Sequence, residues 1–250
     1  MRSTDSGDYQ AVPRSVAVMA KAMENGESTG VHRHPRGQVL YATTGLMIAR
    51  TVAGAWAVPT GHALLIPPRL PHDIAMHGRV EMVTAYISPE TAAVSMPSSC
   101  RVVRVSRLLD AALQSLAQEA VLYDPAGRGG HLAELILDEV RNAEPAALTL
   151  PMPSDKRLRR MCEDVIGDPG KSVDIDTWAA TIGVSRRTLT RRIRQETGLS
   201  FGDWRRRLRH LRTIALEAEG VPMKLVAAEV GYRSPQALKA MLKRTIAREG

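Results

Sequence analysis

The pattern of apolar and polar positions changes its period partway along the chain. Up to about residue 88, short apolar segments alternate with glycine, proline or Asn-Gly, which is typical of short antiparallel strands. Strands are predicted at 16–19, 38–41, 46–49, 55–58, 63–66 and 80–86. Their spacing favours a small antiparallel sandwich or barrel.

From about Ser106 the apolar positions recur with the period of a helix. One predicted helix groups Leu108, Leu109, Ala112, Leu113, Leu116 and Val121 on one face, and a second groups Leu132, Leu135, Ile136 and Val140. The sequence Asp-Pro-Ala-Gly at 124–127 separates the two helices. Apolar faces of this kind either form a contact between two copies of the chain or pack on their own strands.

A proline-rich stretch at 144–154 interrupts the helical pattern and is the linker candidate. The charge changes at the same place. The chain of 250 residues has 34 basic and 26 acidic side chains, but residues 1–150 carry 13 basic and 14 acidic ones. Residues 151–250 therefore hold the whole basic excess. This asymmetry is expected of a domain that meets a polyanion, although a solvated basic surface gives the same count.

Composition excludes several classes of protein. Apolar residues make up 44% and charged residues 24%, as in globular proteins, and no apolar run approaches the ~20 residues of a membrane helix. The N-terminus lacks the apolar core of a signal peptide. Cys100 and Cys162 lie too far apart for a disulfide or metal framework. The sequence predicts a cytoplasmic protein.

The basic part contains one helical unit twice. In the first copy a helix leads into a tight turn at Gly183, and Ser185 caps a second helix. The second copy has Gly231 in the turn and begins its second helix at Ser234-Pro235. Glycine suits such turns because it tolerates positive φ. Both copies are therefore predicted to be helix-turn-helix motifs.

The second helix of each copy is predicted to present a polar face. Leu189 and Ile193 face inward, and the outward side carries Arg187, Thr190, Arg191 and Arg194, with Arg186 at its edge. In the second copy Gln236, Lys239 and Lys243 face outward. A helix ~10–12 Å wide fits a DNA major groove.

The predicted DNA contacts divide into two kinds. We expect Arg187, Thr190 and Arg191 to read base edges. Phosphate contacts are expected from Arg186 and Arg194, and from the run Arg205, Arg206, Arg207 and Arg209.

Three segments carry a family resemblance: VSRRTLTRR at 184–192, ETGLS at 196–200 and VAAEVGYRSP at 226–235. Together they resemble the AraC/XylS family of bacterial transcription regulators, over about residues 155–245. The resemblance implies a two-lobed DNA reader that places its two recognition helices in successive major grooves of promoter DNA. It also implies RNA polymerase as a partner.

A second resemblance lies in the strand region. The spacing Gly-x5-His-x-His-x3-Gln-x6-Gly, from Gly26 to Gly45, and the later stretch ending at His72 are similar to the two motifs of the cupin superfamily of double-stranded β-barrels. The resemblance implies a metal or effector pocket built from His32, His34, Gln38 and His72. Gln38 replaces the family's glutamate, and a neutral amide is a poorer ligand. Three alternatives stay open: a divalent transition metal, a metal-free pocket lined by the histidines, and purely structural histidines.

The sequence thus predicts an α+β chain: a cupin-like sensing domain at 1–100, a helical linker and dimerisation region at 101–147, and an all-α DNA-binding domain at 148–250 with two helix-turn-helix motifs. The leading hypothesis is a homodimeric transcription regulator that binds a small molecule or metal and has no catalytic residues. The competing hypothesis is a metal-dependent cupin enzyme, an isomerase or oxygenase, anchored to DNA. No paired acid and base stand out near the histidines to support it.

Overall fold

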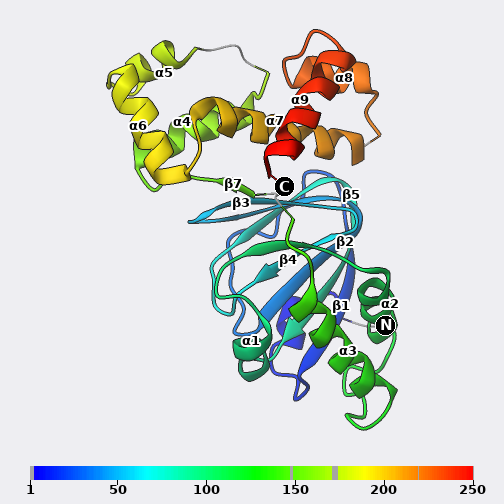
Figure 1. The fold of residues 1–250 in the computed structure, drawn as a ribbon. Coiled ribbons are helices and arrows are strands. Elements are labelled where there is room, and N and C mark those ends of the chain that lie inside the picture. Colours follow the sequence, from blue (N-terminus) through cyan, green and yellow to red (C-terminus); the bar gives the residue numbers. More distant parts are fainter. Residues whose placement is uncertain (1–2, 147–148, 171–173, 219, 250) are drawn as a thin grey trace. The chain divides into compact units, whose positions relative to one another are not determined.

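The computed structural model describes residues 3–146, 149–170, 174–218 and 220–249, which form two compact units (Figure 1). The first unit comprises residues 1–51 and 56–148, and the second comprises 52–55 and 149–250. The domain boundary predicted between 147 and 148 lies outside the described residues. The predicted combination of a strand-rich, barrel-like N-terminal domain and a helical C-terminal domain is confirmed.

Antiparallel strands make up the core of the first unit. They are β1 (Val16–Met23), β2 (Gly37–Thr51), β3 (Gly54–Pro59), β4 (His62–Ile66), β5 (Asp73–Ile87) and β6 (Arg101–Arg104). β5 lies between β1 and β2, while β2 also pairs with β4, which in turn pairs with β6. β6 and the short helix α1 (Pro89–Ser95) were not predicted.

β2 is one continuous strand where the sequence predicts two. Gly45 has a positive φ of 76°, but it forms an irregularity within the strand, because the register between β2 and β5 shifts on both sides of Thr44. A Cβ atom at Gly45 would lie 2.5 Å from the carbonyl oxygen of Arg79. The glycine therefore allows a close approach of two strands and does not make a turn.

Helices α2 (Arg107–Leu116) and α3 (Arg128–Asn142) pack on the barrel through their apolar faces, which share one core with the strands. Leu108 differs from the prediction, since it is 50% exposed, and α2 ends before Val121. Because the buried faces are covered by their own barrel, they are not available for a contact between two copies. The homodimer stays a prediction.

The second unit consists mainly of helices: α4 (Lys156–Gly167), α5 (Ile175–Thr181), α6 (Arg186–Thr197), α7 (Phe201–Ala218), α8 (Met223–Glu229) and α9 (Pro235–Glu249). The short strand β7 (Thr149–Pro151) precedes them. Among the described helices, none has both the length and the apolar character needed to cross a bilayer.

Helices α5–α6 and α8–α9 form the two helix-turn-helix lobes. The turn glycines Gly183 and Gly231 have positive φ values of 71° and 78°. Each second helix begins at a serine, Ser185 or Ser234, whose hydroxyl accepts the backbone N–H three residues ahead at 3.2 Å. The local signals in the sequence thus account for both motifs.

The turn after α4, which precedes the first lobe, meets the second lobe at a backbone contact. Gly170, in the turn after α4, lies so close to Gly231 that a Cβ on Gly231 would be 2.7 Å from the Gly170 carbonyl oxygen. Arg209 of α7 reaches the same place: its Nε donates to the Pro169 carbonyl oxygen at 3.1 Å. Its guanidinium carbon also lies 5.2 Å from the centre of the Tyr232 ring. This set of five residues is called the lobe junction below.

Candidate functional site

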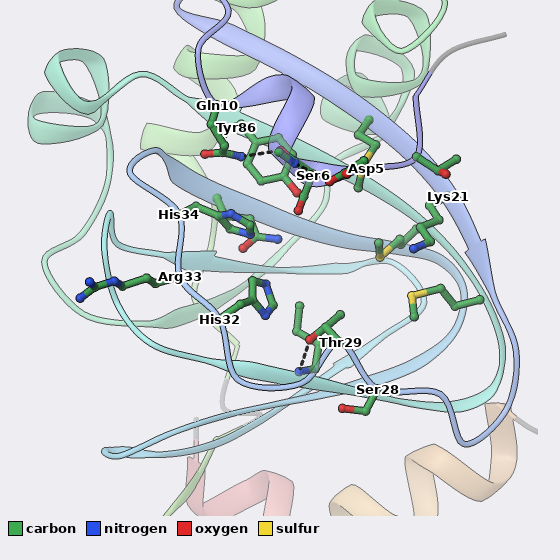
Figure 2. Close-up of a pocket in the computed structure, with 17 residues that line it drawn as sticks. Asp5, Ser6, Gln10, Lys21, Ser28, Thr29, His32, Arg33, His34 and Tyr86 are labelled. Atoms are coloured by element: carbon green, nitrogen blue, oxygen red, sulfur yellow. Dashed lines mark hydrogen bonds between the residues drawn. The ribbon is translucent and has the colours of Figure 1, made fainter.

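The first unit contains a cavity of about 770 Å³, a volume suited to a small molecule (Figure 2). Strands β1, β2 and β5, residues 28–34 and the N-terminal 3-10 helix η1 (Ser6–Tyr9) all contribute to its walls. Its apolar surface comes from Met19, Met23, Ile74 and Met82. Its polar surface includes Lys21, Thr29, His32, Arg33, His34 and Gln38. Figure 2 shows Lys21 well away from the two histidines.

Three histidines come together beside this cavity. His32 and His72 face each other across an antiparallel bridge, in which the backbone N–H of each donates to the carbonyl of the other at 2.9 Å. His34 lies two residues beyond His32 and so projects to the same side of the extended chain. The possible ligand atoms of the three rings lie within 4.8 Å of one another. The structure thus unites residues 40 positions apart in sequence.

Hydrogen bonding determines which ring atoms can act as ligands. Nδ1 of His32 lies 2.8 Å from the Gly30 carbonyl oxygen, and Nδ1 of His72 lies 2.8 Å from that of Leu70. A carbonyl only accepts, so each Nδ1 carries the proton and each Nε2 a lone pair. Nε2 of His72 and Nε2 of His34 are buried and have no hydrogen-bond partner in the described part of the chain.

Burial favours the neutral form of two of these rings, His34 and His72. Desolvation, together with the neighbouring His32 and His72, lowers the pKa of His34 to about 4. Desolvation also lowers the pKa of His72 from its ordinary value. Gln38 lines the same cavity, and its buried Oε1 is likewise without a partner among the described residues. Three imidazoles and an amide oxygen are a donor set that a divalent transition metal fits, although the amide contributes weakly.

A buried arginine holds the N-terminal segment that lines the cavity. Arg36 is only 4% exposed. It donates from Nε to the Gln10 carbonyl at 3.1 Å, from Nη1 to that of Tyr86 at 3.0 Å, and from Nη2 to those of Val12 and Arg14. Burial lowers the pKa of this guanidinium from its ordinary value. No signal near Arg36 in the sequence distinguishes it from a surface arginine, so its role could not be predicted.

The predicted reading surface of the first lobe is exposed on α6, opposite the buried Leu189 and Ile193. Its exposed members are Arg187, Thr190, Arg191 and Arg194. Arg186 is paired with Asp176 of α5 at 2.9 Å. In the second lobe, the side chains of Gln236, Lys239 and Lys243 are exposed on α9. The DNA contacts of these residues stay predictions.

The arginine run on α7 does not form a single surface. Arg205, Arg206 and Arg209 line a cavity in the second unit, and Arg207 is absent from that lining. Arg209 is engaged at the lobe junction, a structural role that the sequence analysis did not give it. Arg244 of α9 completes the lining, and sequence reasoning missed it. A phosphate contact by the four α7 arginines also stays a prediction.

Comparisons with known proteins match both units. The family model described as AraC-like ligand binding domain matches residues 18–136, and the one described as helix-turn-helix domain matches 178–248. The HTH-type transcriptional regulator NimR of Escherichia coli (strain K12) is 28% identical over 230 residues, or 92% of this chain and 84% of NimR. RipA of Corynebacterium glutamicum, also an HTH-type regulator, is 29% identical over 96 residues, or 38% of this chain and 29% of RipA. The structure of ToxT from Vibrio cholerae has a TM-score of 0.38 and 10% identity, covering 93% of this chain and 95% of ToxT.

Proposed function

The chain belongs to the AraC family of DNA-binding transcription regulators with a ligand-binding N-terminal domain, and we propose that this domain binds its effector against a divalent transition-metal ion. His32, His34 and His72 would hold the ion through Nε2, and Gln38 through Oε1. The observation that carries the proposal is the cluster of three histidines, in which Nε2 of His34 and Nε2 of His72 are buried without a partner among the described residues. Leaving such atoms unpaired is costly, and a bound cation would satisfy them.

The rest of the cavity supports a small organic effector. A bound metal would supply a Lewis-acidic anchor for oxygen or nitrogen atoms of that molecule. The methionine side chains Met19, Met23 and Met82 offer an adaptable apolar surface for its body. The segment from Asp5 to Gln10 lines the cavity as well, so effector binding and the position of this segment are coupled.

Removing one histidine of the cluster is expected to weaken metal binding. In a titration of the full chain with Co²⁺ or Zn²⁺, we expect His34→Gln to lower affinity by about tenfold or more, because a ligand is lost. The matched control is His62→Gln, which removes a histidine of the same barrel that lies outside the cluster. Equal affinities of the two variants, or no metal binding by the parent chain, would contradict the metal site. The effector pocket would then be metal-free, which is the alternative that the sequence left open.

Replacing Arg191 tests the reading of bases by α6. With duplexes selected by the protein from a random pool, we expect Arg191→Ala to relax the preference at particular base pairs, at about 1–3 kcal/mol of lost discrimination. Arg192→Ala is the control, because Arg192 lies on the same helix but pairs with Asp155 at 3.7 Å. This variant removes the same charge and should leave the base preference unchanged. If the two variants alter the preference alike, Arg191 does not read bases.

RNA polymerase is a further proposed partner, which follows from family membership. The homodimer stays a prediction, because the helix faces that suggested it pack on their own barrel. The competing hypothesis of a metal-dependent enzyme finds no support in the two curated relatives, which are both regulators. Turnover of a small molecule by the metal-loaded full chain would revive it.

A further inference from the structure

The cavity in the second unit lies where α7 faces α9 and has a volume of about 420 Å³. Its lining consists of Gly202, Arg205, Arg206, Arg209, Tyr232, Met241 and Arg244. Three of the arginines share one stripe of α7, at positions i, i+1 and i+4, and the fourth comes from α9. Four arginines from two helices therefore line one hollow.

The hollow carries an excess of positive charge. Four of its lining residues are arginines, and none of its described lining residues is acidic. Arg206 pairs with Asp203, the residue three positions before it. Arg205 is half-buried, and its pKa is lowered first by desolvation and then by the charge of Arg209. Like charges at short range repel each other, and a bound anion would offset this repulsion by attracting both arginines.

Aromatic rings hold two of the guanidinium groups in place. The guanidinium carbon of Arg205 lies 5.9 Å from the centre of the Phe201 ring, and that of Arg209 lies 5.2 Å from the centre of the Tyr232 ring. Groups positioned in this way lose little conformational entropy when an anion binds. Several arginines in the wall of one hollow suit a phosphate group, which has more acceptor oxygens for their planar N–H forks than a carboxylate has.

We propose that this cavity is a phosphate-binding site in which Arg205, Arg206 and Arg244 hold the phosphate oxygens and Arg209 stays anchored at the lobe junction. The proposal goes beyond the effector pocket, since it concerns the other unit and requires neither the metal nor the effector. The phosphate belongs either to a free phosphorylated molecule or to the backbone of bound DNA. Both sources share the chemistry that the arginines recognise.

Titration of the full chain with inorganic pyrophosphate, in a phosphate-free buffer of low ionic strength, tests the site. We expect Arg244→Gln to weaken pyrophosphate binding about tenfold, because a charge-assisted hydrogen bond is lost. Arg206→Gln, on the other helix of the cavity, should act in the same direction. Arg212→Gln is the matched control: it removes one charge from α7 outside the lining, at an arginine that pairs with Glu229, and it should change the affinity less than about twofold.

Two results overturn the proposal: no binding of pyrophosphate by the parent chain, or equal weakening in Arg212→Gln and Arg244→Gln. A second titration, with a selected duplex already bound at saturation, identifies the source. If DNA excludes pyrophosphate, a backbone phosphate occupies the site in the complex. If pyrophosphate binds to the DNA complex unchanged, the site serves a free phosphorylated molecule. Both of these outcomes support a phosphate site.

Discussion

Replacing Arg36 with methionine is expected to lower the free energy of unfolding of the first unit by about 3 kcal/mol or more. Methionine has a similar reach but donates no hydrogen bond. The carbonyls of Tyr86 and Val12, which are buried where they meet Arg36, would lose their donor. Leaving buried acceptors unsatisfied costs more than the hydrogen bonds themselves contribute. Arg36→Lys should recover little of the loss, because one ammonium cannot reach four carbonyls arranged for a fork.

Hydrogen exchange of the full chain, read peptide by peptide, is suited to this variant because it separates the two units. We expect protection to fall in the N-terminal segment around Gln10 and Val12 and in β5, while α5 and α6 keep theirs. Arg79→Met is the control, since Arg79 is an exposed arginine of β5, and its loss should change stability by no more than about 0.5 kcal/mol. Parent-like protection around Gln10 in Arg36→Met would show that the clamp contributes nothing.

A methyl group at Gly231 is expected to destabilise the second lobe by about 2–5 kcal/mol, combining the left-handed backbone of a non-glycine residue with overpacking. The added Cβ would lie 2.7 Å from the Gly170 carbonyl oxygen and 3.1 Å from Nη2 of Arg209. The contact with Gly170 is with backbone, so rotation of a side chain cannot relieve it. Gly231→Ala should therefore loosen α8 and α9 and weaken DNA binding.

Gly183→Ala separates the two causes. Gly183 has the same place in its motif and a similar φ of 71°, but a Cβ there meets no heavy atom within 4 Å. This variant should cost only the backbone term, about 1–2 kcal/mol. Chemical denaturation of both variants, followed by circular dichroism of the helices, gives the comparison. Equal destabilisation would mean that the contact between the lobes adjusts freely.

Features that depend on neighbouring residues could be predicted from the sequence. Ser185 and Ser234 cap helices, and Gly183 and Gly231 make turns, because capping and positive φ are decided within a few positions. Gly45 also has a positive φ, yet it lies in an irregularity within β2 and not in a turn. Whether such a glycine forms a turn or a bulge depends on the partner strand, here β5, and the local sequence does not identify that partner.

The same distinction applies to the candidate sites. His32 and His34 share a face through simple alternation, but His72 joins them only because two extended segments pair. The family resemblance supplied that pairing, and periodicity alone did not. Arg36 could not be assigned in advance, since any arginine is expected at the surface until the fold is known to cover it. Arg244 is exposed, and only its place beside α7 distinguishes it from other surface arginines. The run from Arg205 to Arg209 divided for a related reason: the packing of α9 decides which side of α7 becomes a hollow.

The contact between Gly170 and Gly231 has a consequence for the operators that this protein can recognise. It holds the turn that precedes the first lobe against the second lobe through backbone atoms, so we expect little freedom for one lobe to swing relative to the other. If the two recognition helices enter successive major grooves, as the family resemblance implies, the two sequences that they read are expected to keep one spacing and one rotational phase, close to a helical turn of ~10.5 base pairs. Promoters that respond to the protein are then expected to be restricted in the length of their spacer as well as in their bases.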